Sequence, residues 1–352
     1  MYIKNYNNMN EFVCNYRSEG GGKNRIAYLD ALKCLGILMV IKGHVKFMGM
    51  GINDTYENPS SLMMYSFNMP IFFFVSGLLA FNGNDLGKLG TICKLKDKFL
   101  FLVLPALCFA AYFKLYDQER VLDLFTKGFG MYWFTFTLFE IFVLYCIAVA
   151  FSRSKLMLLT ILSILSIVGV GYLSFFSKYE IAFLDFNHLA KYFQYFSLGV
   201  AARMYATIYD RIMRSEALRL ISIGAFFVIL TLLFYDFLPS IAYRFLRDIV
   251  LRWLGTFVVV AWFYSNKERF DLDTRLNKWI SKIGKNSLAI YMLQYFFLPN
   301  LQTSNELISN MDVFSIHIFS LVYSIIITLV CLLFIDVLST SKYIKRFALG
   351  KK

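Results

Sequence analysis

Long apolar segments recur along the whole chain, and they limit the folds it can adopt more than any other feature. Of the 352 residues, 58% are hydrophobic and 17% are charged, whereas an average soluble domain is about 25% charged. Each segment approaches the roughly 20 residues that a helix needs to cross about 30 Å of hydrocarbon. The sequence therefore predicts an all-α, polytopic integral membrane protein with about ten transmembrane helices. The expected spans are residues 31–48, 61–81, 99–114, 129–151, 156–176, 188–206, 220–235, 245–264, 286–306 and 313–336.

Lysine and arginine concentrate at one end of these spans. If the N-terminus is inside, 25 of the 36 Lys and Arg fall in segments on the cytoplasmic side and 5 in segments on the outer side. This asymmetry is typical of cytoplasmic loops, so both termini are expected in the cytoplasm. It also accounts for the net charge of +13 without a nucleic-acid partner, since no soluble module presents a basic patch with interleaved aromatic residues.

The rest of the chain is organised simply. Residues 1–24 are polar and are expected to form a disordered cytoplasmic tail. Residues 25–340 form the expected transmembrane domain, and residues 341–352 a basic cytoplasmic tail. No Cys or His residues have the spacing of a metal site, so no metal is expected.

The first span carries more charge than a lipid-facing helix tolerates, because one charged side chain at the bilayer centre costs roughly 2.5–3.5 kcal/mol. Lys33 and His44 are eleven residues apart, which is about 20° past three full turns. They therefore share one helix face, roughly 16 Å apart along the axis, and Asp30 joins that face. An intramembrane His usually faces a cavity or a partner, and it exchanges protons near neutral pH. This face is a candidate catalytic surface.

Simpler interpretations exist for the other basic residues of this span. Lys33 could extend to the cytoplasmic headgroups and Lys46 to the outer ones. Lys42 could pair with a carboxylate on another helix.

Six motifs follow one another along the chain. The first consists of Arg25, Asp30, Lys33 and His44. The others read FNMPIFFFVSG (67–77), KFLFLVLPAL (98–107), YWFTFTLFE (132–140), KYFQYFSLGVAAR (191–203) and IGKNSLAIYMLQYFF (283–297). Together they resemble the membrane-bound acyltransferase-3 family, bacterial membrane enzymes that typically move acetyl groups onto sugars of surface polysaccharides. The chain departs from the family pattern at Asn68, Phe101 and Gln294, where a His, a second basic residue and a His are usual.

The resemblance implies an acyl-CoA donor, expected to be acetyl-CoA, and a glycan or lipid-linked sugar as acceptor. It also implies a multi-pass protein in the bacterial inner membrane, in contact with its lipids. His44 is the expected general base, and Glu140 could orient its imidazole or act with it. Arg25, Lys33 and Lys98 are expected to bind the phosphates of coenzyme A. The expected acceptor-binding residues are Asn68, Trp133 and Gln294.

Structural alternatives remain open for several of these residues. Glu140 could be a structural partner of Lys42 or Lys191. Arg25 and Lys98 could reflect only the cytoplasmic excess of basic residues, and Trp133 could belong to an interfacial aromatic belt.

Two further expectations concern the second span. Ser76 and Gly77 are expected to serve helix packing. Pro70 is expected to kink the helix and free a carbonyl, beside which Asn68 could bind substrate.

Two classes of function fit these patterns. The first is a membrane O-acyltransferase with His44 as the base. The second is a transporter or flippase for a glycan or lipid, with the same polar groups lining a path. Transporters often contain inverted repeats, and the sequence shows no internal repeat, which favours the enzyme.

The orientation can be tested with reporter fusions. Fusions after Asn58 and Asn310 should report the outer side, and a fusion after Lys342 the cytoplasm, because of the distribution of basic residues. Alkaline phosphatase and fluorescent-protein reporters read the two sides. A cytoplasmic signal after Asn58 would contradict the orientation.

Overall fold

The computed structural model describes residues 26–53, 58–83, 86–87, 94–116, 118, 121, 130–176, 186–235, 239–301 and 311–341. Within these ranges the chain is predominantly helical and contains no strand, which confirms the all-α class. Arg25, the tail at 1–24 and most of the tail at 341–352 lie outside the described residues, so the expected domain boundaries stay predictions.

The first half of the chain contributes the following elements. They are α2 (Ala27–His44), the π-helical turn η1 (Val45–Gly49), α3 (Pro59–Tyr65), α4 (Asn68–Ala80), α5 (Lys94–Lys98), the π-helical turn η4 (Phe99–Val103), α6 (Leu104–Tyr116), the 3₁₀ turn η5 (Gly130–Tyr132), α8 (Trp133–Phe151) and α9 (Lys155–Phe176).

The second half continues in the same way. Its elements are α10 (Phe186–Met204), α11 (Ala206–Arg214), α12 (Glu216–Phe234), α13 (Ser240–Phe245), the π-helical turn η7 (Leu246–Val250), α14 (Leu251–Ser265), α15 (Lys267–Asp271), α16 (Arg275–Lys285), α17 (Ser287–Leu293), the 3₁₀ turn η8 (Gln294–Phe297) and α19 (Val313–Leu338).

Described helices lie in each of the ten expected spans, but only six helices of the described chain are long and apolar enough to cross a bilayer by themselves. These are 59–80, 95–116, 130–151, 155–174, 216–234 and 313–338. The remaining four spans are shorter or more polar. The first, sixth and eighth contain several charged or amide side chains, and the helical part of the ninth covers only Ser287–Phe297. The count of ten and the orientation of the termini stay predictions.

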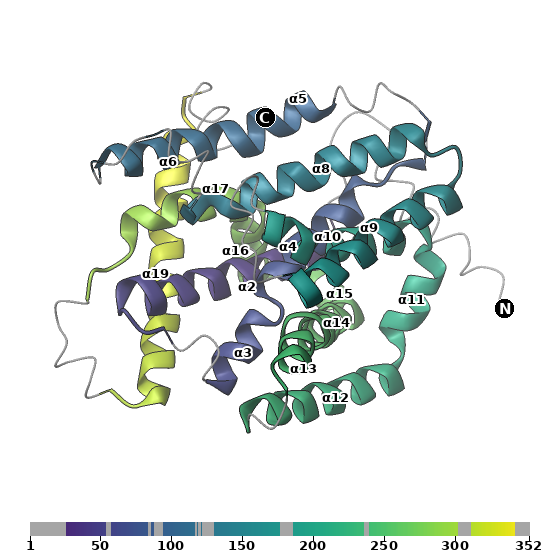
Figure 1. Ribbon diagram of the computed structural model, residues 1–352. Coiled ribbons are helices and arrows are strands. Elements are labelled where there is room, and N and C mark those ends of the chain that lie inside the picture. Colours follow the sequence, from purple (N-terminus) through teal and green to yellow (C-terminus); the bar gives the residue numbers. More distant parts are fainter. Residues whose placement is uncertain are drawn as a thin grey trace.

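Helices α2, α4 and α10 form the centre of the molecule in Figure 1, with α6 and α8 above them and α12 below. Two glycines bring α4 and α10 into close contact. A Cβ at Gly77 would lie 2.0 Å from the carbonyl oxygen of Phe196, and one at Gly199 would lie 2.1 Å from that of Phe74. Small residues allow such approaches between membrane helices. The packing role expected for Gly77 is confirmed.

The second span breaks where Pro70 requires it. Proline lacks a backbone N–H and its ring excludes the carbonyl four residues earlier, which here belongs to Ser66. The helix is interrupted at Ser66 and Phe67, between α3 and α4. The freed Ser66 carbonyl accepts a hydrogen bond from the Thr256 hydroxyl at 3.4 Å. The expected kink and the freed carbonyl are both confirmed.

Lys46 does not extend to the outer headgroups. Its side chain is only 4% exposed, and its ammonium donates to the Ser61 hydroxyl at 2.9 Å. This expectation was wrong because Lys46 lies in η1, which packs inside the protein, and Ser61 of α3 provides a hydrogen-bond partner there. A buried ammonium with such a partner is cheaper than an unsatisfied one.

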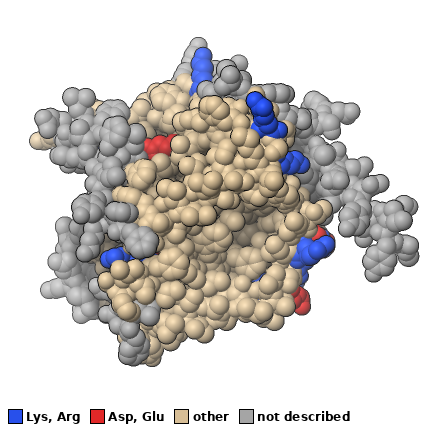
Figure 2. Space-filling view, turned by 45° about the vertical axis from the view of Figure 1, so that its right-hand side comes forward, with Lys and Arg blue, Asp and Glu red and all other residues tan. Residues whose placement is uncertain are grey.

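The side of the molecule on which α9 and α11 lie is largely apolar. In Figure 2, which brings this side forward, Lys, Arg, Asp and Glu are few and lie toward the margins of a wide uncharged area. Large apolar side chains are exposed on α9 and α12, among them Ile167, Leu220 and Ile221. An exposed apolar surface of this extent is expected to face lipid.

The contact between α4 and α10 can be tested by adding one methyl group. Gly199→Ala should destabilise the protein by about 1–3 kcal/mol, because the new Cβ meets backbone atoms that cannot move aside. Gly224→Ala is the matched control, since a Cβ there meets nothing within 4 Å. Thermal unfolding of the detergent-solubilised protein measures the difference. Equal melting temperatures for the two variants would contradict the close contact.

Candidate functional site

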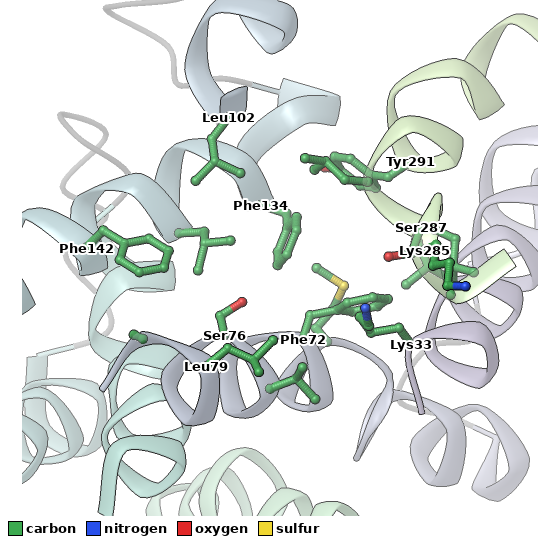
Figure 3. Close-up of a pocket in the computed structure, with 18 of the residues that line it drawn as sticks. Lys33, Phe72, Ser76, Leu79, Leu102, Phe134, Phe142, Lys285, Ser287 and Tyr291 are labelled. Carbon is green, nitrogen blue, oxygen red and sulfur yellow. The ribbon is translucent and has the colours of Figure 1, made fainter. Parts of the chain in front are cut away.

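A cavity of about 280 Å³ opens among α2, α4, α8 and α17. Apolar and aromatic side chains form most of its wall. Its polar lining residues are Lys33, Lys98, Lys285, Ser76, Ser287 and Tyr291. In Figure 3, Lys33 lies with Lys285 and Ser287 at one end of the cavity, Phe142 lies at the other, and the Ser76 hydroxyl points into the space between.

Three lysines from separate elements reach this cavity. Lys33 of α2 forms an ion pair with Asp30, Nζ to Oδ1 2.6 Å. Lys98, at the end of α5, lies over the ring of Phe142 at 4.0 Å from its centroid. Lys285 ends α16. Sequence reasoning expected Lys33 and Lys98 together but missed Lys285, which stands in the quoted IGKNS motif and was counted only as a cytoplasmic charge.

Along α2, one face leads from the cavity to His44. Lys33, Ile37 and Val40 line the cavity at helical spacing, and His44 follows Val40 by one turn. His44 itself is not among the lining residues. It is half-buried and continues the same face beyond the end of the cavity, as the spacing predicts.

Gln294 is the hydrogen-bond partner of His44. Nδ1 of His44 lies 3.1 Å from Oε1 of Gln294, and Nε2 of Gln294 donates to the Tyr291 carbonyl at 3.2 Å. Because the amide oxygen only accepts, Nδ1 of His44 carries the proton in this arrangement, and its Nε2 holds a lone pair. Gln294 is fully buried, whereas His44 is half-buried. Such a neutral imidazole is able to accept a proton at Nε2.

Three tyrosines hold the structure around this pair. The Tyr295 ring lies 5.1 Å from that of His44, and its hydroxyl donates to the Met131 carbonyl at 2.7 Å. Tyr291 donates to the same carbonyl at 2.7 Å. Tyr132 donates to the Met292 carbonyl at 3.1 Å. These bonds join η5, directly before α8, to α17 and η8, and thereby hold the turn that carries Gln294.

Glu140 faces away from the cavity. Leu138 and Phe142 of α8 line it, and Glu140 lies about 200° from each of them around the helix. The described hydrogen bond of His44 is to Gln294, not to Glu140. Its catalytic role stays a prediction. Lys191 was the alternative structural partner of Glu140. It forms an ion pair with Asp248, in which Nζ lies 3.0 Å from Oδ1.

The expected acceptor-binding residues separate in space. Asn68 begins α4, is 3% exposed, and accepts a hydrogen bond from the Met69 backbone N–H at 2.7 Å. Trp133 begins α8 and stacks on His188, with ring centroids 4.0 Å apart. Gln294 contacts His44 rather than either of these. Of all the expected site residues, the structure brings Lys33 to Lys98 and His44 to Gln294.

Comparison with known proteins identifies the family. No curated protein and no solved structure matches the chain. The family model of acyltransferase 3, described as an acyltransferase domain, matches residues 26–336 and so covers the cavity, His44 and Gln294. The apolar helices agree with a membrane protein. The chain therefore belongs to the acyltransferase-3 family of membrane acyltransferases.

Proposed function

We propose that this membrane acyltransferase moves an acetyl or other short acyl group from acyl-CoA to a sugar hydroxyl of a surface polysaccharide or lipid-linked glycan. The observation that carries the proposal is one face of α2. It begins at a cavity lined by three lysines and ends at a histidine with an unprotonated Nε2.

The cavity suits an acyl-CoA donor on two grounds. Its lysines offer point charges for phosphates, and its largely apolar wall suits a thin, uncharged chain that carries the thioester. The ion pair with Asp30 holds the Lys33 ammonium close to its own helix. Lys98 and Lys285 come from other elements, so a phosphate between them would be held from several sides.

The chemistry follows from the state of His44. Its Nε2 takes the proton of the acceptor hydroxyl as the hydroxyl oxygen attacks the thioester carbonyl. The C–S bond then breaks, the acyl group stays on the sugar oxygen, and the coenzyme A thiolate takes the proton back from the imidazolium. Gln294 acts as a positioning residue, because its amide oxygen holds the proton on Nδ1 throughout.

The position of Trp133 supports an acceptor site on the outer side. This residue lies at the end of α8 that the distribution of basic residues predicts to be outside, where its ring stacks on His188. An enzyme in the bacterial inner membrane would there meet glycans of the envelope.

Glycan mass spectrometry on cells with and without the gene tests the activity. Loss of an acetyl mass from a surface polysaccharide is the expected result. Unchanged acylation together with impaired glycan export would favour a transporter instead.

If the cavity is the donor site, removing one of its lysines should lower the affinity for acyl-CoA. Lys33→Ala and Lys285→Ala should each weaken acetyl-CoA binding about tenfold to a hundredfold, the range of a lost hydrogen bond to a charged group. Lys33→Arg should retain more because the charge remains. Lys278→Ala is the control, since that side chain is 66% exposed and pairs with Asp273. Titration calorimetry on the purified protein gives the affinities. If Lys33→Ala binds acetyl-CoA as tightly as the wild type, Lys33 forms only its ion pair with Asp30 and does not bind the donor.

Substitutions of the proposed base, His44, and of its positioning residue, Gln294, should both lower the turnover rate. His44→Ala should lower the turnover rate by about 10²–10⁴-fold, and His44→Gln nearly as much, because neither can take the proton. Gln294→Leu should also lower the turnover rate, while Gln294→Glu, which keeps an accepting oxygen, should retain more.

Acetyl transfer from radiolabelled acetyl-CoA to the native glycan in membrane vesicles measures both effects. Acetyl-CoA affinity should stay constant in all four variants. High activity in His44→Gln would reduce His44 to a structural residue and move the search for the base to Glu140.

A further inference from the structure

Helix α16 carries three kinds of side chain on three separate faces. One face packs on α2. Gly284 lies against Asp30, whose carbonyl oxygen would be 2.0 Å from a Cβ at that position, and the Ser281 hydroxyl donates to the Asp30 carboxylate at 3.4 Å. A second face is apolar and not covered by the protein, since Leu276 is 68% exposed and Trp279, almost one turn later, is 50% exposed. At 100° per residue, the centres of these two faces are about 140° apart.

The third face of α16 is basic. Its four cations occupy about 80° of the helix circumference, centred about 120° from the exposed apolar face; they are Arg275, Lys278, Lys282 and Lys285. Lys278 and Lys282 form ion pairs with carboxylates of the protein. Arg275 is exposed and forms no ion pair with any described residue. Residues 267–285 together hold six Lys and Arg against three Asp and Glu, so the region carries an excess of positive charge.

Helix α16 lies at the level where the expected first span begins and α19 ends. Asp30, which its packed face contacts, is the fourth residue of α2. Lys282 pairs at 2.7 Å with Asp336, two residues before the end of α19, a helix long and apolar enough to cross a bilayer. The neighbouring Val337 is exposed, as expected of a lipid-facing side chain. The position of α16 is therefore the edge of the lipid-facing surface, where hydrocarbon gives way to headgroups.

A helix with these faces fits the surface of a bilayer. Helices with one apolar and one basic face lie in the plane of the interface, with the apolar face at the boundary of the acyl chains. Tryptophan is enriched at this depth, because its amphipathic ring suits the headgroup level. Acidic headgroups complement the charge of Arg275 and the excess in residues 267–285. Insertion would also remove Leu276 and Trp279 from water, which is favourable.

The same helix forms one end of the donor cavity. Lys285 directly follows Gly284 and lies with Lys33 at that end (Figure 3). The carboxylate of Asp30 joins the two helices there, because Oδ1 pairs with Lys33 at 2.6 Å and Oδ2 accepts the hydrogen bond from Ser281. A shift of α16 would therefore move Lys285 directly and Lys33 through Asp30.

We propose that α16 docks on the headgroups of acidic phospholipids through Arg275, Leu276 and Trp279, and that this docking holds Lys285 in place in the donor cavity. The second clause rests on the proposed acyl-CoA site; the first does not. The proposal accounts for large exposed apolar side chains on a helix of 11 residues, about half the length that a membrane span needs. It also makes the affinity for the donor depend on how α16 lies on the membrane.

Quenching of Trp279 fluorescence by brominated lipids tests the docking. The full chain is placed in nanodiscs of equal parts phosphatidylglycerol and phosphatidylcholine, with bromine on the acyl chains of one lipid at a time. The difference between the wild type and Trp279→Phe isolates the signal of this ring among the four tryptophans. Brominated phosphatidylglycerol should quench it about twofold more than brominated phosphatidylcholine, because acidic headgroups gather beside Arg275.

Two results would overturn the docking. Equal quenching by the two lipids would remove the role of headgroup charge, and no quenching by either would show that Trp279 faces water or another protein. Arg275→Gln should reduce the preference for phosphatidylglycerol. Arg211→Gln, which removes an equal charge from an exposed position on α11, should leave it unchanged. The same preference in Arg275→Gln as in the wild type would exclude Arg275 from the contact and contradict the proposal.

Titration of acetyl-CoA in phosphatidylglycerol nanodiscs tests the effect on the cavity. Leu276→Ser should lower the affinity about threefold to tenfold, because α16 loses part of its contact with lipid and Lys285 moves with it. Leu220→Ser on α12 is the matched control, since that side chain is 66% exposed, and it should bind as the wild type does. All variants are compared in one lipid, so the repulsion between acidic headgroups and coenzyme A cancels.

The two measurements also separate this proposal from the proposed function. Equal affinity in Leu276→Ser and the wild type would overturn the link between docking and the cavity. If the wild type binds no acetyl-CoA, the proposed donor site fails and the second clause fails with it. The quenching of Trp279 still decides the docking in that case, because it requires no donor.

Discussion

Every polar side chain inside this bundle needs a partner within the protein, because hydrocarbon offers none. Several of the described contacts follow that constraint, whereas the buried hydroxyls of Thr137 and Tyr195 have no hydrogen-bond partner among the described residues. Lys46 bonds to Ser61, Lys33 to Asp30, and the Ser66 carbonyl, freed by Pro70, to Thr256. Ser61 and Thr256 come from elements that must be correctly placed for these bonds to exist, whereas Asp30 lies on the same helix as Lys33. The constraint thereby fixes how α2, α3, α4 and α14 pack, and the apolar contacts fill the space between them.

The close contacts of α4 and α10 serve the same end. Gly77 and Gly199 remove the side chains that would hold the two helices apart. Gly284 does so where α16 meets α2, since a Cβ there would lie 2.0 Å from the Asp30 carbonyl oxygen. That contact brings the end of α16, and with it Lys285, beside Lys33. The position of a lysine in the cavity thus depends on a glycine one residue earlier.

Much of this architecture could be predicted from the sequence, and the reason is physical. Apolar length and helical periodicity act locally, so the helical segments, the Pro70 break and the shared face of Lys33 and His44 follow from residues close in the chain. Contacts between residues distant in the chain could not be predicted in this way. Lys191 reaches Asp248 across 57 residues, and His44 reaches Gln294 across 250. Gln294 was expected to bind the acceptor because one sequence shows its polarity and position but not the imidazole opposite it.

The cavity beside Lys33 and the ion pairs of Asp248 lie in different surroundings. The cavity lies among α2, α4, α8 and α17 and is lined by lysines from three elements, which would suit the acyl-CoA donor that we propose. Asp248 pairs instead with Lys191, Arg247 and Arg252, and none of these four residues lines the cavity. His44 lies one turn beyond Val40 of the cavity and beside Tyr295. If His44 is the base, as we propose, the reactive ends of donor and acceptor must meet at its Nε2, beyond the end of the cavity.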